Sequence, residues 1–311
     1  FSRKQFRTEI IHNAKKTRAF VKIQDGCDNR CSYCTIPFAR GNNRSDSIEN
    51  IIRQINLFAE EGYYETVLTG IHIGQWANDF ETKKSLQNLL EEIEKTKIKR
   101  YRPGSLNPTE LPSDFIDFLA KSDKFCPHFH LSLQSVCDKT LKNMNRRYDS
   151  QRIKELVEEI NSKFEHPFIG SDIIAGFPGE TEADFEITLN NLKTMKLSRI
   201  HVFPYSRRKG TVADRMQGQI PESEKKRRAA EIQKISDEKL KLFLSENLAT
   251  TNEVIIENRR DKKTGMLKGV TKNYINVLLD GDDGLKNTVQ KVILKEIYDE
   301  GKQMIAKICL D

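Results

Sequence analysis

The stretch GCDNRCSYC, residues 26–34, holds three of the chain's six cysteines, Cys27, Cys31 and Cys34. A structural zinc site normally takes four protein ligands, often as two cysteine pairs or as cysteines with distant histidines. Here the spacing is C-x3-C-x2-C, and the other three cysteines lie far away in the chain. A cubane iron–sulfur cluster has four irons, so three cysteine ligands leave one iron open to another molecule. The triplet favours such a cluster, with a zinc site that borrows a distant ligand as the alternative.

The composition is that of a globular protein. Of the 311 residues, 37% are hydrophobic and 31% are charged, and no apolar run approaches the roughly 18 residues that a membrane span needs. The N-terminal stretch lacks the apolar run of a secretory signal. Six unevenly spread cysteines do not make a secreted disulfide framework. We therefore expect a soluble protein of the reducing cytoplasm, without membrane contact.

Six short runs typical of β-strands alternate with helical patterns over the first two thirds of the chain. The strands are expected at residues 19–25, 66–71, 98–105, 128–134, 168–176 and 199–206. The helical patterns between them cover residues 46–61, 86–95, 113–121, 151–163 and 182–193. This alternation predicts an α/β fold with a parallel sheet, a (β/α)6-type partial TIM barrel.

The pattern changes after about residue 219. A long charged helix covers residues 221–248, and short alternating runs separated by Gly and Asp turns then predict a small antiparallel β-barrel. We expect three parts: residues 1–18 as a basic linker or domain remnant, 19–250 as the α/β core and 251–311 as the barrel. The first part carries six cations, which indicate a polyanionic partner or simply a solvated tail: Arg3, Lys4, Arg7, Lys15, Lys16 and Arg18.

Four segments, the first of which contains the cysteine triplet, lie at or beside the predicted strand ends. They are QDGCDNRCSYCTIPFARG (24–41), LQSVCDKTLKNMNRRY (133–148), DIIAGFPGETEADF (172–185) and HVFPYSRRKGT (201–211). In this order they resemble the radical S-adenosylmethionine methylthiotransferases. LTGIHIG (68–74) and SLNPTEL (105–111) are most similar to the MtaB type, which converts N6-threonylcarbamoyladenosine beside the tRNA anticodon to its 2-methylthio derivative. The last part of the chain resembles the TRAM domain that these enzymes use to bind RNA.

This resemblance implies a tRNA methylthiotransferase. Cys27, Cys31 and Cys34 would hold a 4Fe-4S cluster whose fourth iron binds S-adenosylmethionine, and flavodoxin or ferredoxin would supply electrons. Family members also begin with a domain that carries a second 4Fe-4S cluster. Because the chain begins at Phe1 without such a domain, we expect a fragment or a processed chain. We expect it to be a monomer that cleaves S-adenosylmethionine but does not complete methylthiolation.

Two sets of alternatives stay open. The substrate of the same chemistry could be isopentenyl-adenosine in tRNA or an aspartate of a ribosomal protein. From another class, the chain could be a non-catalytic RNA-binding protein with a structural metal site.

Candidate cofactor contacts follow from the resemblance and from the rule that ligands lie at the carboxyl ends of parallel strands. Glycines there allow close approach of backbone to a cofactor, although a plain turn is an alternative. The candidates are Tyr33, Gly70, Gln134, Arg147, Asp172 and Gly176, with Glu180 beside the last of them. His128 and His130 share one strand face and are interpreted as packing or hydrogen-bonding groups.

The predicted barrel is nearly neutral, with 11 Lys and Arg against 10 Asp and Glu over residues 252–311. RNA binding would therefore need a patterned face. The cations that flank its first hairpin are the candidates for phosphate contact, and a solvated hairpin tip is the alternative: Arg259, Arg260, Lys262, Lys263, Lys268 and Lys272.

Overall fold

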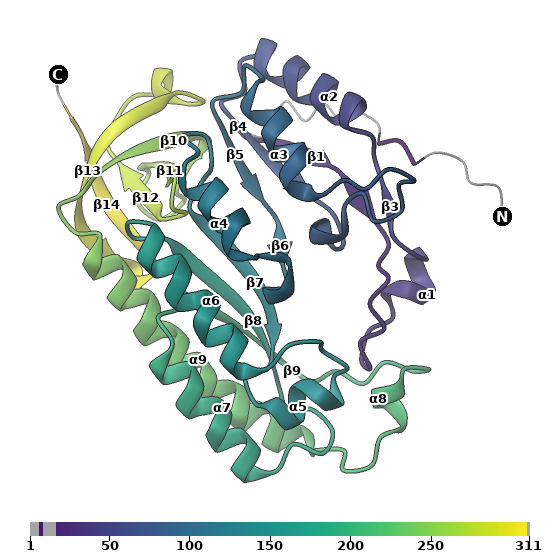
Figure 1. Cartoon of the computed structure of the whole chain (residues 1–311). Helices are drawn as coiled ribbons and strands as arrows, with labels where there is room; N and C mark the ends of the chain where they lie inside the picture. The colour runs from purple at the N-terminus through teal and green to yellow at the C-terminus, as the bar shows by residue number, and fades with distance from the viewer. Residues whose placement is uncertain (1–5, 9–16, 310–311) are drawn as a thin grey trace.

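The computed structural model describes residues 6–8 and 17–309. Figure 1 shows an α/β body, in which strands lie beneath a layer of helices, and a small barrel packed against one end of it. Most of the basic segment 1–18 lies outside the described residues, including Arg3, Lys4, Lys15 and Lys16. The role predicted for that segment stays a prediction.

Parallel strands make up the sheets of the body, close to where the sequence predicts them. They are β1 (Ala19–Lys22), β4 (Glu65–Thr69), β5 (Arg100–Pro103), β6 (Ser105–Leu106), β7 (His128–Gln134), β8 (Phe168–Ala175) and β9 (Arg199–Pro204). They form two sheets, β1-β4-β5 and β6-β7-β8-β9. The strand predicted at 98–105 is interrupted at Gly104, because β5 pairs with β4 whereas β6 pairs with β7. The predicted α/β class with parallel strands is confirmed.

The long helices also match their predicted ranges within a few residues. They are α2 (Ile48–Glu60), α3 (Leu86–Glu94), α4 (Ser113–Ala120), α6 (Ser150–Lys163), α7 (Glu182–Thr194) and α9 (Glu222–Glu246). Shorter elements were not predicted, since a turn or two leaves no periodic signal. These are α1 (Ile36–Arg40), α5 (Asp138–Asn143), α8 (Val212–Arg215), the strand β3 (Arg44–Ser45), and the 3-10 turns η1 (Ile73–Gln75) and η2 (Pro108–Glu110). The strand predicted at 19–25 is interrupted at Ile23, because β1 pairs with β4 whereas β2 (Gln24–Asp25) pairs antiparallel with β3. No helix in the described part of the chain is both long and apolar enough to cross a membrane.

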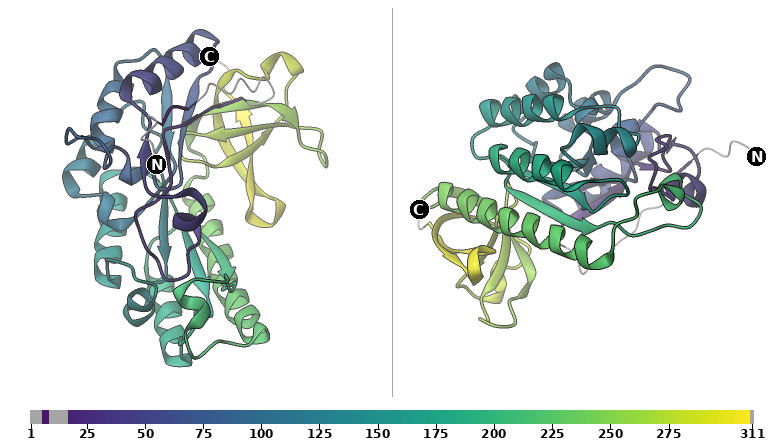
Figure 2. Two further views of the ribbon diagram at one scale, coloured as in Figure 1. Left: turned by 90° about the vertical axis from the view of Figure 1, so that its right-hand side faces the viewer. Right: turned by 90° about the horizontal axis from the view of Figure 1, so that it is seen from below.

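Alternation along the strands separates a packed face from a polar one. On β7, Phe129, Leu131 and Leu133 are buried in the main hydrophobic core, whereas His130 and Gln134 on the other face are only half-buried. Residues at alternate positions of a strand point to opposite sides of the sheet. The helices therefore cover the apolar face, as the ribbons of Figure 2 show, and the polar side chains of β7 lie on the opposite face.

The C-terminal strands close into a barrel in the order β10-β11-β12-β14-β13. Their bounds are β10 (Thr251–Arg260), β11 (Leu267–Thr271), β12 (Asn276–Leu279), β13 (Val289–Tyr298) and β14 (Gln303–Ile308), with the 3-10 turns η3 (Asp283–Leu285) and η4 (Asp299–Gly301). The sequence predicts an antiparallel barrel, but β12 and β14 run parallel. That detail of the prediction is wrong for a geometric reason: five strands in a closed ring cannot alternate in direction all the way round.

The barrel contacts the amino-terminal ends of the body's strands. Arg100 and Arg102 of β5 donate to the carbonyls of Val270 and Thr271 at 3.3 and 3.4 Å. The ring of Tyr274, in the turn after β11, lies 4.1 Å from that of His128, at the start of β7. The carboxyl ends of the same strands are left free of the barrel, as Figures 1 and 2 show.

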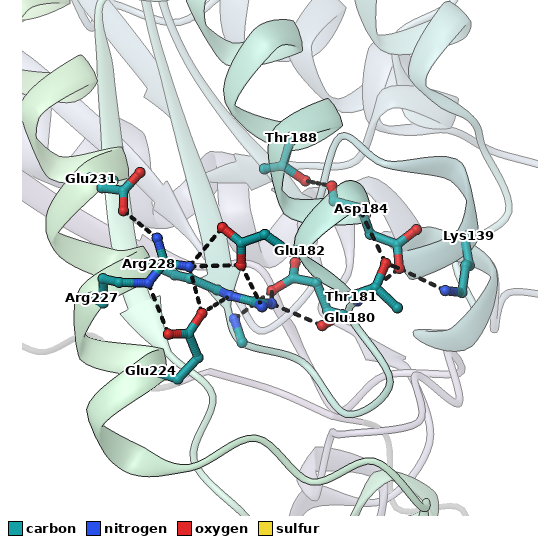
Figure 3. A network of polar contacts seen from close by, with 11 residues as sticks. Lys139, Glu180, Thr181, Glu182, Asp184, Thr188, Glu224, Arg227, Arg228 and Glu231 are labelled. Carbon is teal, nitrogen blue, oxygen red and sulfur yellow. Dashed lines mark hydrogen bonds and ion pairs between the residues drawn. The ribbon is translucent and has the colours of Figure 1, made fainter.

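Helix α9 belongs to both parts. Ile232 and Ile235 pack in the main core, whereas Leu240, Phe243 and Leu244 pack in the core of the barrel. Near its first turns α9 also holds the loop that follows β8 through a polar network (Figure 3).

The centre of that network is the buried ion pair between Arg228 of α9 and Glu180. Arg228 donates to the carboxylate and to the carbonyl of Glu180 at 2.9 Å, and the same carboxylate accepts from the N–H of Gly176. Burial raises the pKa of Glu180 although Arg228 opposes that shift. Arg227, the preceding residue, is exposed and pairs with Glu182 at 2.7 Å.

This contrast yields a stability prediction. Arg228→Met leaves the Glu180 carboxylate buried without its cation and is expected to lower the free energy of unfolding by about 3 kcal/mol. Arg227→Met removes only exposed ion pairs and is expected to leave the urea midpoint nearly unchanged. Urea denaturation followed by circular dichroism compares the two variants. Equal midpoints would contradict a stabilising role for the buried pair.

Candidate functional site

The cysteine loop lies at the carboxyl end of the sheet, directly after β1 and β2. Cys27, Cys31 and Cys34 are free thiols, and all three are half-buried. Burial raises the pKa of the Cys34 thiol; the N–H of Ile36, which donates to its sulfur at 3.4 Å, opposes the shift, and the nearby Cys31 and Cys27 add to it. The three sulfurs are thus close enough to interact.

A histidine after β4 reaches Cys27, and polar groups after β6 contact the other side of its ring. Nδ1 of His72 lies 3.4 Å from the Cys27 sulfur, and Nε2 of the same ring contacts the Glu110 carboxylate and the amide of Asn107. Glu110 also accepts from the N–H of Asn107 at 2.8 Å. Burial lowers the pKa of His72, but its bonds to Cys27 and Glu110 outweigh burial and raise that pKa to about 9. A cation therefore stands beside this thiol.

A second cation reaches Cys31. Arg146 donates from Nη1 to the Cys31 sulfur at 3.4 Å. Its other nitrogens contact the side chain of Asn107, the carbonyl of Ser132 at 2.6 Å and the hydroxyl of Tyr148 at 2.6 Å. Burial opposes the charge on Arg146, but Tyr148 and Cys31 raise its pKa. Loops after three strands thus meet around two of the thiols.

A pocket of about 220 Å³ opens beside this network. Among the described residues, those that line it include no aliphatic side chain. They are Asn29, Cys31, Gly74, Gln75, Asn78, Asn107, Thr109, Glu110, Asn145, Arg146, Arg147 and Tyr148. Such a surface offers many hydrogen-bond donors and two guanidinium groups. It suits a small polar or anionic ligand.

The donor set of the cysteine loop fits an iron–sulfur cluster. Thiolates are the ligands that such clusters take, and each of three thiolates binds a different iron, so they need not converge on one point. No three His, Cys, Asp or Glu side chains among residues 6–8 and 17–309 converge on a site for a single metal ion.

The predicted cofactor contacts divide into those near the thiols and those that are not. Tyr33 lies between Cys31 and Cys34 in the loop and packs edge-on against Phe177, with 6.3 Å between ring centroids. Arg147 lines the polar pocket. Gln134 ends β7 with a φ of 64°. The structure brings Tyr33 and Arg147 to the cysteine loop.

The two predicted glycines each have a packing explanation within the chain. A Cβ on Gly70 would lie 2.9 Å from the side chain of Gln24, and one on Gly176 would lie 2.6 Å from the side chain of Lys225. Gly176 also has a φ of +74°, which favours glycine. Protein atoms occupy the side on which each Cβ would lie.

Asp172 and Glu180 also have partners within the protein. Asp172 on β8 lies 3.0 Å from Nε2 of His130 on β7, on the polar face of the sheet. Glu180 is buried against Arg228, as described above. His128 is half-buried and its ring packs against those of Phe168 and Tyr274, in agreement with the packing role predicted for it.

The six cations predicted to contact RNA lie on and beside the first hairpin of the barrel. Four of them form ion pairs with acids of the barrel, at N–O distances from 2.8 to 4.0 Å: Arg259, Arg260, Lys263 and Lys268. Lys272 donates to the carbonyl of Asp123 on the body at 2.5 Å, and Lys262 is exposed. Their contact with RNA stays a prediction.

Sequence reasoning missed His72, Asn107, Glu110 and Arg146. Each lies within a segment that the resemblance singled out, LTGIHIG, SLNPTEL or LKNMNRRY. The spacing of a motif does not tell which of its polar side chains turns toward the thiols. In LKNMNRRY the sequence predicts Arg147 as a cofactor contact, whereas its neighbour Arg146 is the residue that contacts Cys31.

With this geometry established, comparison with known proteins identifies the family. A model described as the radical SAM superfamily matches residues 21–192, more than half of the chain. The chain belongs to the radical SAM superfamily. The matched range contains the cysteine loop and every residue of the polar network around it.

Curated relatives of this radical SAM chain include tRNA-modifying enzymes. It is 35% identical over 302 residues to the threonylcarbamoyladenosine tRNA methylthiotransferase MtaB of Bacillus subtilis, covering 95% of this chain and 66% of the relative. It is also 35% identical over 281 residues to the tRNA-2-methylthio-N(6)-dimethylallyladenosine synthase of Carboxydothermus hydrogenoformans, covering 90% and 64%. The chain thus spans slightly less than two thirds of the length of these relatives.

A solved structure supports the same fold. Coproporphyrinogen III oxidase (HemN) from Escherichia coli, a radical SAM enzyme, matches with a TM-score of 0.54 at 12% identity, covering 96% of this chain and 73% of that one. At this identity the likeness concerns the fold alone.

Proposed function

We propose that the chain is the radical SAM part of a tRNA methylthiotransferase that converts N6-threonylcarbamoyladenosine to its 2-methylthio derivative. The observation that carries the proposal is the similarity to MtaB of Bacillus subtilis across 95% of the chain. The half-buried thiols at the carboxyl ends of the strands, next to a polar pocket, support it.

Cys27, Cys31 and Cys34 would hold three irons of a 4Fe-4S cluster, and S-adenosylmethionine would bind beside them. When bound, these cofactors supply one-electron chemistry that can remove an unactivated hydrogen from the adenine ring. His72 and Arg146 place positive charge beside two of the sulfurs. Such contacts outside the ligands orient them and tune the metal centre.

The polar pocket favours threonylcarbamoyl over dimethylallyl as the group on the target base. A threonylcarbamoyl group carries a carboxylate, a hydroxyl and urea-type N–H groups, and the pocket offers Arg146, Arg147, Asn107 and Glu110. A site built to hydrogen-bond a substrate strongly rejects an analogue that leaves its polar groups unpaired. A dimethylallyl group is a branched hydrocarbon and would call for an apolar wall.

A second candidate substrate is dimethylallyladenosine in tRNA. The equal identity of 35% to the Carboxydothermus synthase supports it. The two candidates share the reaction and differ only in the group that the pocket has to accommodate.

The remaining parts of the proposal concern the whole protein. We propose that residues 19–250 form a partial (β/α)6 barrel and that residues 251–311 are a TRAM-like RNA-binding domain. The sulfur would come from a second 4Fe-4S cluster on a further domain, and flavodoxin or ferredoxin would be the reductant. We propose a cytoplasmic monomer.

Nucleoside mass spectrometry tests the proposal. Transfer RNA from cells that lack the gene encoding this chain is compared with tRNA from cells in which the gene is restored, and a Cys31→Ala gene is the matched control. The expected result is that 2-methylthio-threonylcarbamoyladenosine disappears, returns with the restored gene and does not return with Cys31→Ala. A change in the dimethylallyl nucleoside instead would select the second candidate, and no change in either would overturn both.

A further inference from the structure

We propose that three segments at the carboxyl ends of the strands form a docking surface for single-stranded RNA, here called the cationic rim. The segments are residues 26–41, 142–148 and 206–216. This inference rests on the proposed function and names the surface by which the RNA would be held. That surface lies on the α/β body and is separate from the barrel, for which RNA binding is proposed above.

Hydrogen bonds join the three segments around Ser32. The N–H of Ser32 donates to the carbonyl of Met144 at 3.1 Å, and its hydroxyl donates to the carbonyl of Asn143 at 2.7 Å. Its own carbonyl accepts from the N–H of Ala213 at 2.8 Å. The side chain of Asn145 donates to the carbonyl of Arg30 at 2.8 Å. Segments far apart in sequence therefore form one surface around the cysteine loop.

The charge of the chain is concentrated on this surface. The three segments contain nine Lys and Arg residues against two Asp residues, an excess of seven. That excess equals the net charge of the entire chain, +7. A strong local field of one sign attracts polyanions and steers their approach. Figures 1 and 2 show α1, α5 and α8, which belong to or adjoin these segments, at the far end of the body from the barrel.

Several rim cations have no neutralising partner. Arg40, Arg208, Lys209 and Arg215 are exposed and form no ion pair with any described residue. The barrel differs, because four of the six cations on and beside its first hairpin are paired with acids. An unpaired surface cation can contact a phosphate without first breaking an ion pair. The rim can therefore bind a phosphate backbone at a lower energetic cost than the barrel hairpin can.

Exposed aromatic rings lie at the same end of the body. The side chain of Phe38, in α1 two residues before Arg40, is 78% exposed, and that of Phe203, near the end of β9, is 52% exposed. Every nucleobase has a flat face that can stack on such a ring. Proteins that bind single-stranded nucleic acids combine cations with exposed aromatic rings in this way.

The combination favours RNA over an acidic protein. A carboxylate-rich surface would need the cations alone and would leave both rings in water. The pocket beside Cys31 lies within the same surface, and Arg147 belongs both to segment 142–148 and to the pocket wall. A strand held on the rim would thus bring a splayed base toward the thiols.

Binding of an anticodon stem–loop RNA tests the rim directly, without turnover. The rim variant is R40Q/R208Q/K209Q. The matched control is K226Q/K234Q/K241Q, which removes three exposed cations of α9 that form no ion pair with any residue in the described ranges. Fluorescence anisotropy over a salt series gives Kd and its salt slope for each variant, and the thermal midpoint checks that each variant folds.

The rim variant is expected to raise Kd at least tenfold and to reduce the salt slope by about 2, since each phosphate contact on single strands contributes about 0.7. The control is expected to change Kd less than twofold. A second variant, F38A/F203A, is expected to raise Kd about tenfold while the salt slope stays the same, because stacking releases no counterions.

Two results would overturn the proposal. One is an unchanged Kd and salt slope for the rim variant. The other is competition by polyglutamate as effective as that by unlabelled RNA, together with no effect of F38A/F203A, which would indicate a protein partner. RNA binding is measured without methylthiolation. The binding result therefore tests the rim even if the proposed methylthiotransferase function fails.

Discussion

Cys31→Ala is expected to remove the cluster and the chemistry that depends on it. After anaerobic reconstitution the unaltered chain should hold about four irons, whereas the variant should hold almost none, because two cysteines cannot retain a cubane. Reductive cleavage of S-adenosylmethionine should fall to the level of a sample without iron. Iron analysis and chromatographic detection of 5′-deoxyadenosine measure the two effects.

Cys309→Ala is the matched control. Cys309 is also a free, half-buried thiol, but it follows β14 at the end of the barrel, away from the cysteine loop. The control should keep its iron and its cleavage activity. Iron retained in Cys31→Ala, or lost equally in both variants, would contradict the assignment of the cluster to the loop.

Glu65→Gln should destabilise the fold strongly. Glu65 is fully buried at the start of β4, with its carboxylate 2.6 Å from Nε of Arg100 and 3.1 Å from Nε of Arg102, and Arg18 lies 3.6 Å away. Removal of the carboxylate leaves two buried guanidinium groups without their counter-ion. The expected loss in free energy of unfolding is about 3–5 kcal/mol. Urea denaturation at neutral pH measures it.

The pH dependence of that loss identifies its cause. Burial would raise the pKa of Glu65, but Arg102, Arg100 and Arg18 outweigh burial and hold it at about 2, below the usual 4.5. A carboxyl group with a lowered folded-state pKa stabilises the fold fully above its unfolded pKa and loses that effect as pH falls through the folded pKa. The difference between the unaltered chain and Glu65→Gln should therefore shrink from about pH 4.5 to about pH 2.

Glu92→Gln is the control for this series, since Glu92 forms an exposed pair with Lys95. It should leave stability nearly unchanged at every pH. A Glu65→Gln difference that stays constant down to pH 2 would point to altered packing and not to the lost charge.

Much of the fold could be predicted because its signals are local. The helical pattern at 86–95 and the alternation at 128–134 depend only on neighbours in sequence, and α3 and β7 follow them closely. The break at Gly104 and the parallel pair β12 with β14 could not be predicted in this way. Both depend on which strands become neighbours in space, and neither leaves a mark in the spacing of apolar residues.

The candidate site could also be predicted from the sequence only in part. The cysteine triplet predicts an iron–sulfur centre, because three thiols within eight positions seldom occur by chance, and the matched family implies such a cluster. The contacts of His72 with Cys27 and of Arg146 with Cys31 join residues 45 and 115 positions apart. Only the folded sheet brings those strand ends together. Glu180 looked like a ligand contact for the same reason: its partner Arg228 lies 48 residues away.

The long helix α9 fixes the distance between the loop after β8 and the barrel. It has 25 residues, which at 1.5 Å per residue gives a rod of about 37 Å. Its first turns are fixed beside the loop after β8, and its last turns are embedded in the barrel. A polynucleotide that touches both ends has to cover that distance. The number of residues in α9 therefore sets the separation that an RNA in contact with both the cationic rim and the barrel would have to span.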